Sequence, residues 1–142
     1  MLASGFGLGF LPVAPGTFGS LLGIPLYLAF LHVTDQILPT VLFVGALTAA
    51  ACWIAGRAEQ VLGEHDPGEI VIDEVVGMLI TLLWVPPSVL NLVLAFLLFR
   101  VLDVVKPWPA GEIDRRLPGG AGVVLDDVVS GIYANVLMRL ML

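Results

Sequence analysis

The sequence predicts an all-α protein: a compact multi-span bundle of membrane helices, some of them short or re-entrant, in one membrane-embedded domain over residues 1–142. Composition is the first observation, because 58% of the 142 residues are hydrophobic and 13% are charged, whereas soluble domains carry roughly 25% charged residues. The second is a mean hydropathy of +1.02. The third is that apolar runs fill most of the chain, which argues against a soluble domain with a single anchor.

Five apolar segments follow one another along the chain. Several are near 16 residues, or about 24 Å of helix, which is short of the roughly 20 residues of a full span. Tilted helices, half-spans or re-entrant helices are therefore expected among them. Their expected bounds are Phe18–Val33, Ile37–Ala58, Ile70–Val85, Leu90–Val105 and Val128–Leu142.

Prolines and tryptophans mark the segment ends. Pro86 and Pro87 separate the third segment from the fourth, and Pro107 ends the fourth, because proline cannot continue the helical hydrogen-bond ladder. Trp84 and Trp108 fall at predicted span ends, where indole rings favour the membrane interface. The polar, glycine-rich stretch 110–122 is expected to be a connector.

The charge balance and the cysteine count exclude some classes of protein. A formal net charge of −6 argues against a nucleic-acid partner, which would require a basic patch. Cys52 is the single cysteine, so no intramolecular disulfide can form. No secretory signal is expected, since the first basic residue is Arg57.

Sixteen of the eighteen charged residues lie between Arg57 and Asp127, and only Asp35 and Arg139 lie outside that stretch. Charge is costly in lipid, so this concentration predicts a metal, a phosphate, or both. The basic residues cluster near 57 and in 106–116, which favours a cytoplasmic position for both loops.

The first charged motif is HDPGEIVIDE, residues 65–74. Asp66 can be the N-cap of the third helix, with Glu69 as its capping-box partner. Asp73 and Glu74 are then expected a turn or more inside an apolar helix, where a carboxylate costs on the order of 2.5–3.5 kcal/mol at mid-bilayer. A functional role is predicted for these two carboxylates.

The second motif, FRVLDVVKPWP, places Arg100, Asp103 and Lys106 three residues apart on one broad helix face. Lys106 also complements the helix dipole at the C-terminal end. An ion-pair ladder would explain the pairing. It would not explain three charges on an otherwise nearly charge-free helix, so function is favoured.

The third motif is DRRLPGGAGVVLDD. Asp126 or Asp127 can be the N-cap of the last helix, which leaves the other for metal or substrate. Arg115 and Arg116 can hold a phosphate through the guanidinium fork, or can equally be interfacial anchors.

The fourth motif is the opening, GFGLGFLPVAPGTFGS. Thr17 or Ser20 can cap the first helix, and a helix start with glycines can receive an anion. The motif is not a P-loop, because no Gly-Lys-Ser/Thr follows.

Together these motifs offer an all-oxygen ligand set, which suits a hard cation such as Mg²⁺. Arg100, Lys106 and Arg115 are candidates for phosphate binding, as are Thr17 and Ser20. This inventory predicts metal-assisted phosphoryl chemistry. The candidate metal ligands are Asp73, Glu74, Asp103, Asp126 and Asp127.

Four ordered blocks resemble the bacterial phosphatidylglycerophosphatase A family: GxGxxPxAPGTxGS, HDxGxIVxDExVGM, FRxxDxxKPWP and DRxxxGGxGxxxDD. The resemblance spans nearly the whole chain. It implies an integral, magnesium-dependent phosphatase of the bacterial inner membrane. The apolar segments predict a multi-pass protein, and the basic loops predict an active site that faces the cytoplasm. The implied reaction converts phosphatidylglycerophosphate to phosphatidylglycerol and inorganic phosphate.

The expected nucleophile is a water activated by the metal, with His65 or one carboxylate as general base; an aspartate nucleophile stays open. The rival hypothesis is a small membrane metal or ion transporter, which predicts carboxylates spread through the membrane depth. The number of metals, the oligomeric state and the breadth of lipid phosphate specificity stay open. The candidate catalytic residues are His65, Asp73, Glu74, Asp103 and Asp127.

Overall fold

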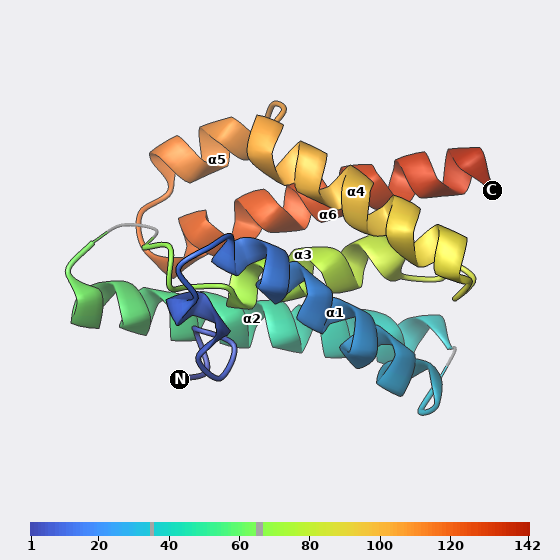
Figure 1. The fold of residues 1–142 in the computed structure, drawn as a ribbon, viewed down its shortest axis with the longest axis horizontal. Helices are drawn as coiled ribbons and strands as arrows, with labels where there is room; N and C mark the ends of the chain where they lie inside the picture. The colour runs from blue at the N-terminus through green and yellow to red at the C-terminus, as the bar shows by residue number, and fades with distance from the viewer. Residues whose placement is uncertain (35, 65–66) are drawn as a thin grey trace.

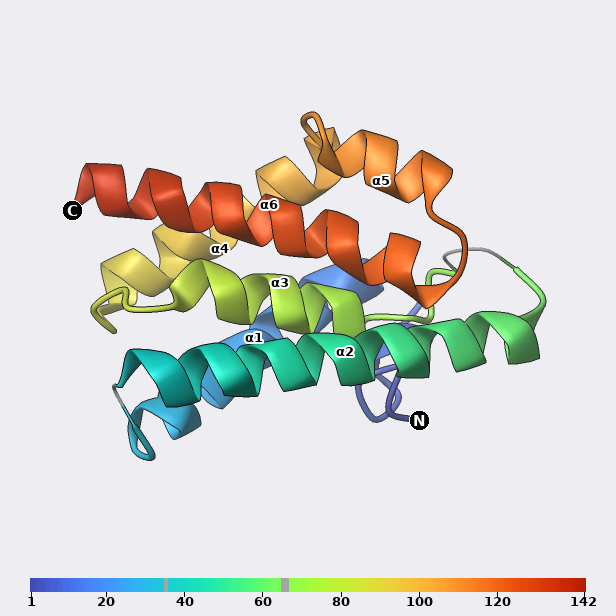
Figure 2. The same ribbon diagram turned by 180° about the vertical axis from the view of Figure 1, so that it is seen from behind.

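The computed structural model describes residues 1–34, 36–64 and 67–142, and within them it is helical, with no strand. Figure 1 shows the helices lying side by side in a bundle, and Figure 2 shows the same bundle from behind. The all-α class predicted from composition is therefore confirmed. The elements are η1 (Leu8–Phe10), α1 (Pro15–Leu31), α2 (Ile37–Leu62), α3 (Ile72–Leu82), α4 (Val89–Val105), α5 (Ala110–Arg116) and α6 (Gly120–Met141).

Helix α3 is the centre of the bundle. It packs against α1, α2, α4 and α6, whereas the short α5 packs on α6. All residues from Val76 to Leu82 are buried, and a helix that is apolar on all sides is expected to lie inside its protein. The rest of the molecule is therefore arranged around the 11 residues of α3.

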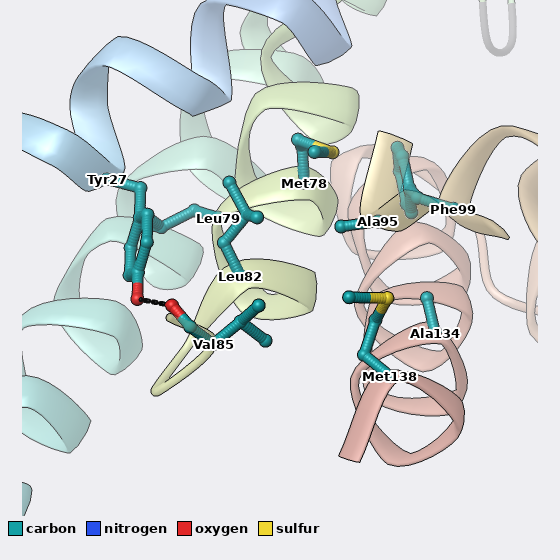
Figure 3. Close-up of a cluster of buried hydrophobic side chains, with 9 residues drawn as sticks. All are labelled: Tyr27, Met78, Leu79, Leu82, Val85, Ala95, Phe99, Ala134 and Met138. Carbon is teal, nitrogen blue, oxygen red and sulfur yellow. Dashed lines mark hydrogen bonds between the residues drawn. The ribbon is translucent and has the colours of Figure 1, made fainter. Parts of the chain in front are cut away.

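Side chains from four helices and the turn after α3 form the main core cluster, shown in Figure 3. The hydroxyl of Tyr27 donates a hydrogen bond of 2.7 Å to the carbonyl of Val85. This bond satisfies the one polar atom that Tyr27 brings into the core. The members are Tyr27, Met78, Leu79, Leu82, Val85, Ala95, Phe99, Ala134 and Met138.

Two glycines let α3 and α6 cross in close contact. A Cβ atom at Gly131 would lie 2.5 Å from the carbonyl oxygen of Gly77, and a Cβ at Gly77 would lie 2.5 Å from the ring of Phe99. The hydroxyl of Thr81 donates to the Gly77 carbonyl at 2.9 Å. Neither glycine position has room for a side chain, so the two backbones approach each other here.

Side-chain donors satisfy the carbonyls at the end of α3, which a helix cannot pair internally. The amide of Asn135 donates to the carbonyls of Thr81 and Leu83, at 2.9 Å each. The amide of Asn91 donates to Pro86 at 2.9 Å. The turn between α3 and α4 is therefore held by α4 and α6.

Two helices, α2 and α6, are long and apolar enough to cross a membrane, by length and composition. Helix α1 is apolar but shorter. Only 11% of the most apolar stretch of α2 is buried within the protein, and large side chains such as Leu38 and Leu42 are exposed. Apolar surface of this extent on a helix suits lipid better than water.

The predicted start of the last helix is wrong by eight residues. Helix α6 begins at Gly120, with Gly119 as its N-cap at φ 71°, so neither Asp126 nor Asp127 caps it. A Cβ at Gly120 would collide with the carbonyl of Cys52 on α2. The glycines that suggested a connector instead allow the first turn of α6 to pack against α2.

The predicted start of the third helix is also wrong. Helix α3 begins at Ile72 with Val71 as N-cap, so Glu69 is not a capping-box residue, and Asp66 lies outside the described residues. Asp73 and Glu74 occupy the first turn of α3 and not a deeper position. Acidic residues are favourable there, because the N-terminal end of a helix carries partial positive charge.

Two smaller predictions are corrected as well. Ala14 is the N-cap of α1 and the helix begins at Pro15, so Thr17 and Ser20 lie inside α1 and do not cap it. The expected connector 110–122 contains α5. Proline at the first helical position, which is favourable there, moves the start of α1 ahead of both hydroxyls.

The crossing of α3 and α6 generates a stability prediction. We expect Gly131→Ala to lower the free energy of unfolding by about 1–3 kcal/mol, because the new methyl group must displace backbone. The measurement is unfolding in detergent micelles. The matched control is Gly45→Ala on α2, where a Cβ meets nothing within 4 Å, and which should raise stability by roughly 0.5–1 kcal/mol. Equal effects of the two variants would contradict the close crossing.

Candidate functional site

Four helix ends that carry the predicted site residues lie at one end of the bundle. They are the starts of α1, α3 and α6 and the end of α4, all toward the left in Figure 1. The predicted site residues on these helices are 50 or more positions apart in sequence between α1 and α3 and between α3 and α6. The fold therefore brings the four sequence motifs toward one region.

Three carboxylates meet there, and we call them the carboxylate trio: Asp73 and Glu74 of α3 and Asp127 of α6. Each offers one oxygen, and these oxygens lie within 4.8 Å of one another. Asp73 is 6% exposed and Asp127 is 2% exposed. Glu74 Oε2 and Asp127 Oδ2 are buried and find no hydrogen-bond partner among the described residues. Buried oxygens without partners are costly, and a cation would satisfy them.

The close crossing of α3 and α6 positions the trio. Gly77 follows Asp73 by four residues, and Gly131 follows Asp127 by four. Residues four apart share a helix face, so both aspartates lie one turn before the contact, on the faces that meet. A Cβ at Gly77 would also lie 2.9 Å from the carbonyl oxygen of Asp127. The glycine pair thus sets the separation of the two carboxylates.

Helix α4 adds an ion pair beside the trio. Arg100 Nη1 lies 2.6 Å from Asp103 Oδ2 and 3.5 Å from the hydroxyl of Ser20. Arg100 and Asp103 both lie close enough to Glu74 to interact with it electrostatically, and Asp103 also interacts with Asp127. The predicted ion-pair ladder is present between Arg100 and Asp103. The pair faces the trio. The same two residues can therefore stabilise the helix as an ion pair and take part in the site.

The start of α1 packs directly against this charged region. A Cβ at Gly16 would collide with Glu74 Oε1 and would lie 3.2 Å from Arg100 Nη1. Ser20 is buried, and its hydroxyl donates to the carbonyl of Gly16 at 2.9 Å. Thr17, partly exposed, lies on the same first turns of α1. Sequence reasoning missed Gly16, although the APGT motif contains it.

Lys106 ends α4 and pairs with two carboxylates outside the trio. Its Nζ lies 2.5 Å from Asp126 Oδ2 and 3.2 Å from Asp114 Oδ2. Burial by itself lowers the pKa of Lys106, but the two carboxylates outweigh it and raise the pKa above its ordinary value. A lysine with a raised pKa keeps its ion pairs at neutral pH and loses them only as the pH rises through that value.

Asp126 is therefore separated in role from its neighbour Asp127. Its Oδ2 pairs with Lys106, and its Oδ1 accepts the backbone N–H of Asp127 at 2.9 Å. Successive helical residues point about 100° apart, so the two aspartates face different partners. The structure places Asp126 next to Lys106 and not within the carboxylate trio.

One predicted site residue, Arg115, is not brought to the trio. Arg115 is 74% exposed, its Nη2 lies 3.9 Å from Glu112, and its Nε donates to the carbonyl of Gly111. These contacts keep Arg115 on the surface of α5. His65 lies outside the described residues, so its predicted role as general base stays a prediction. Asp114, which the structure pairs with Lys106, was not predicted to be a site residue, although it is the first residue of the third motif.

Comparison with known proteins gives a consistent result. The sequence profile described as "Phosphatidylglycerophosphatase A" matches residues 1–142. A protein of that name from Escherichia coli K12 is 39% identical over 135 residues, covering 94% of this chain and 77% of the relative. A protein of the same name from Haemophilus influenzae Rd is 37% identical over 139 residues, covering 97% and 85%.

A third relative carries a different name. The "Putative phosphatidylinositol-3-phosphatase" of Bacteroides thetaiotaomicron is 39% identical over 144 residues, covering 97% of this chain and 89% of the relative. No solved structure matches the chain. The full-length profile match and the two relatives of that name show that this chain belongs to the phosphatidylglycerophosphatase A family and is a phosphatase.

Proposed function

We propose that this phosphatase is a magnesium-dependent lipid phosphomonoesterase that hydrolyses phosphatidylglycerophosphate to phosphatidylglycerol and phosphate at the membrane surface. The observation that carries the proposal is the carboxylate trio, because it joins three carboxylates from two helices within 4.8 Å. Family membership supports the phosphatase activity and the phosphatidylglycerophosphate substrate. The magnesium requirement rests on the chemistry of the site.

The trio fits a hard divalent cation. Its donors are all carboxylate oxygens, which Mg²⁺ prefers, and Mg²⁺ commonly uses one or two carboxylates together with substrate phosphate. The buried oxygens of Glu74 and Asp127 that have no partner among the described residues would gain one. We assign Asp73, Glu74 and Asp127 as ligands. Asp103 lies beside them, paired with Arg100, and Asp126 is outside the set.

The protein's own residues would divide the reaction between them. Arg100 has a planar guanidinium that suits phosphate oxygens, and it lies beside Glu74 at the start of α1. Asp103 holds Arg100 in place at 2.6 Å. A bound magnesium ion would neutralise phosphate charge and lower the pKa of a water molecule. His65 or one trio carboxylate would accept the proton of the attacking water.

We place the protein in the bacterial inner membrane, with several spans and the active site facing the cytoplasm. The length and apolar surface of α2 and α6 support a membrane location. Helix α5, which carries Arg115 and Arg116, packs on α6, and Lys106 pairs with Asp126 next to the trio residue Asp127. Loops rich in Lys and Arg favour the cytoplasmic side. The phosphate of a lipid headgroup would be at that level.

The transporter hypothesis has less support. A transport pathway predicts ionisable residues along the depth of the membrane. The trio, Asp103 and Asp126 instead gather in one cluster around the first turn of α3. A site at the headgroup level explains this distribution, and a pathway does not.

The relatives' names define a test of headgroup specificity. We expect phosphate release from phosphatidylglycerophosphate in mixed micelles to exceed release from phosphatidylinositol 3-phosphate and from phosphatidic acid. The measurement is kcat/KM for each lipid with magnesium present. A preference for phosphatidylinositol 3-phosphate would reject the proposed substrate but not the phosphatase activity.

The trio is tested by isosteric substitutions that remove one charge each. We expect Asp73→Asn, Glu74→Gln and Asp127→Asn each to lower kcat/KM about a hundredfold or more, a loss typical of removing transition-state stabilisation. Glu64→Gln changes an exposed carboxylate and is the matched control. Near-normal activity in any two of the trio variants would remove the trio from the mechanism.

Metal binding is tested without activity. We expect Mg²⁺ to raise the thermal unfolding midpoint of the wild type, since a ligand at 100 times its Kd adds about 2.7 kcal/mol of stability. Asp127→Asn should lose most of this shift, whereas Glu64→Gln should keep it. Equal shifts in wild type and Asp127→Asn would place the cation elsewhere.

A further inference from the structure

Lys106 is held from two sides. Its Nζ pairs with Asp126 of α6 at 2.5 Å and with Asp114 of α5 at 3.2 Å. A lysine ammonium has three N–H donors and a long flexible stem. Two carboxylates therefore occupy two donors and restrict the stem, which leaves one N–H for another acceptor.

The position of Lys106 relates it to the trio. It follows Asp103 by three residues on α4, about 4.5 Å along the helix axis. Its partner Asp126 directly precedes Asp127 on α6. Asp103 and Asp127 lie close together where α4 meets α6, and the ion pair of Lys106 with Asp126 lies next to that point. Lys106 is thus a cation at the edge of the acidic site.

Asp114 brings α5 into this arrangement. Helix α5 packs on α6 and places Asp114 against Lys106. The other acidic residue of α5, Glu112, pairs with Arg115 and Arg116 on the surface. The side chains of Lys106 and Asp114 are each 26% exposed. Solvent therefore screens the charge of Asp114 from a nearby phosphate, while its contact still restricts the position of the lysine.

We propose that Asp114 is a positioning residue, which together with Asp126 directs the remaining N–H of Lys106 toward a phosphate oxygen of the substrate. The proposal rests on the proposed function and deepens it. Lys106 binds the phosphate in addition to Arg100 in this scheme, and Asp114 acts only through Lys106. The short helix α5 then has a role at the site without touching the substrate.

The test is Asp114→Asn in the full chain. We expect the KM for phosphatidylglycerophosphate and the inhibition constant of inorganic phosphate each to rise about fivefold, the upper range for a partly exposed ion pair. The kcat value and the magnesium concentration for half-maximal activity should change less than twofold. Asp114→Glu should restore most of the phosphate affinity. Glu112→Gln, on the same helix, is the matched control and should leave both constants unchanged.

A double-mutant cycle separates positioning from support of the fold. In a Lys106→Ala background, Asp114→Asn should cause no further rise in either constant, because the group it positions is absent. An equal rise in both backgrounds would overturn the proposal. A fall in the phosphate inhibition constant would also overturn it, since Asp114 would then compete with phosphate for Lys106.

A binding measurement tests the role of Asp114 even if the proposed function is wrong. Inorganic phosphate should raise the unfolding midpoint of the wild type and of Glu112→Gln more than that of Asp114→Asn, in the presence of Mg²⁺. If the wild type releases no phosphate from any lipid phosphomonoester, the proposed substrate and reaction fail, and this shift still tests Asp114. Identical shifts in all three proteins would reject the positioning role.

Discussion

The close crossing of α3 and α6 at Gly77 and Gly131 is the contact on which the site depends. No Cβ fits at either position, so the backbones approach more closely than any larger residue would allow. The ring of Phe99 fills the space above Gly77 and joins α4 to the same contact. One helical turn away, the crossing brings Asp73 and Asp127 together. Packing of small residues thereby sets the geometry of an acidic site.

The acidic site in turn requires balancing charge. Three carboxylates within 4.8 Å repel one another, and desolvation makes this repulsion stronger than in water. The protein places Arg100 on one side, paired with Asp103, and Lys106 on the other, paired with Asp126. A site with this excess of negative charge and buried oxygens suits a divalent ion and a phosphate that binds with it.

The two ends of the bundle are organised differently. At the site end, charges from α3, α4 and α6 face inward around buried carboxylates. At the other end, side-chain donors from Asn135, Tyr27 and Arg139 satisfy the carbonyls that follow α3. The core cluster of Figure 3 lies next to that turn, with Val85 as a member. Function and packing thus occupy opposite ends of the same short central helix.

The sequence by itself determined the helical class and the motifs. Apolar composition favoured a membrane protein over a soluble domain, prolines ended α4 at Val105, and the excess of carboxylates in an apolar chain singled out Asp73 and Glu74. Only the tertiary structure decided which charges meet. It placed Asp127 in the trio and Asp126 on Lys106, and it kept Arg115 on the surface of α5. Neighbouring residues differ by about 100° in direction on a helix. Their partners therefore depend on where α6 begins and how it crosses α3. Gly120, in the stretch that the sequence suggested was a connector, packs the start of α6 against α2, and Gly77 and Gly131 set the crossing.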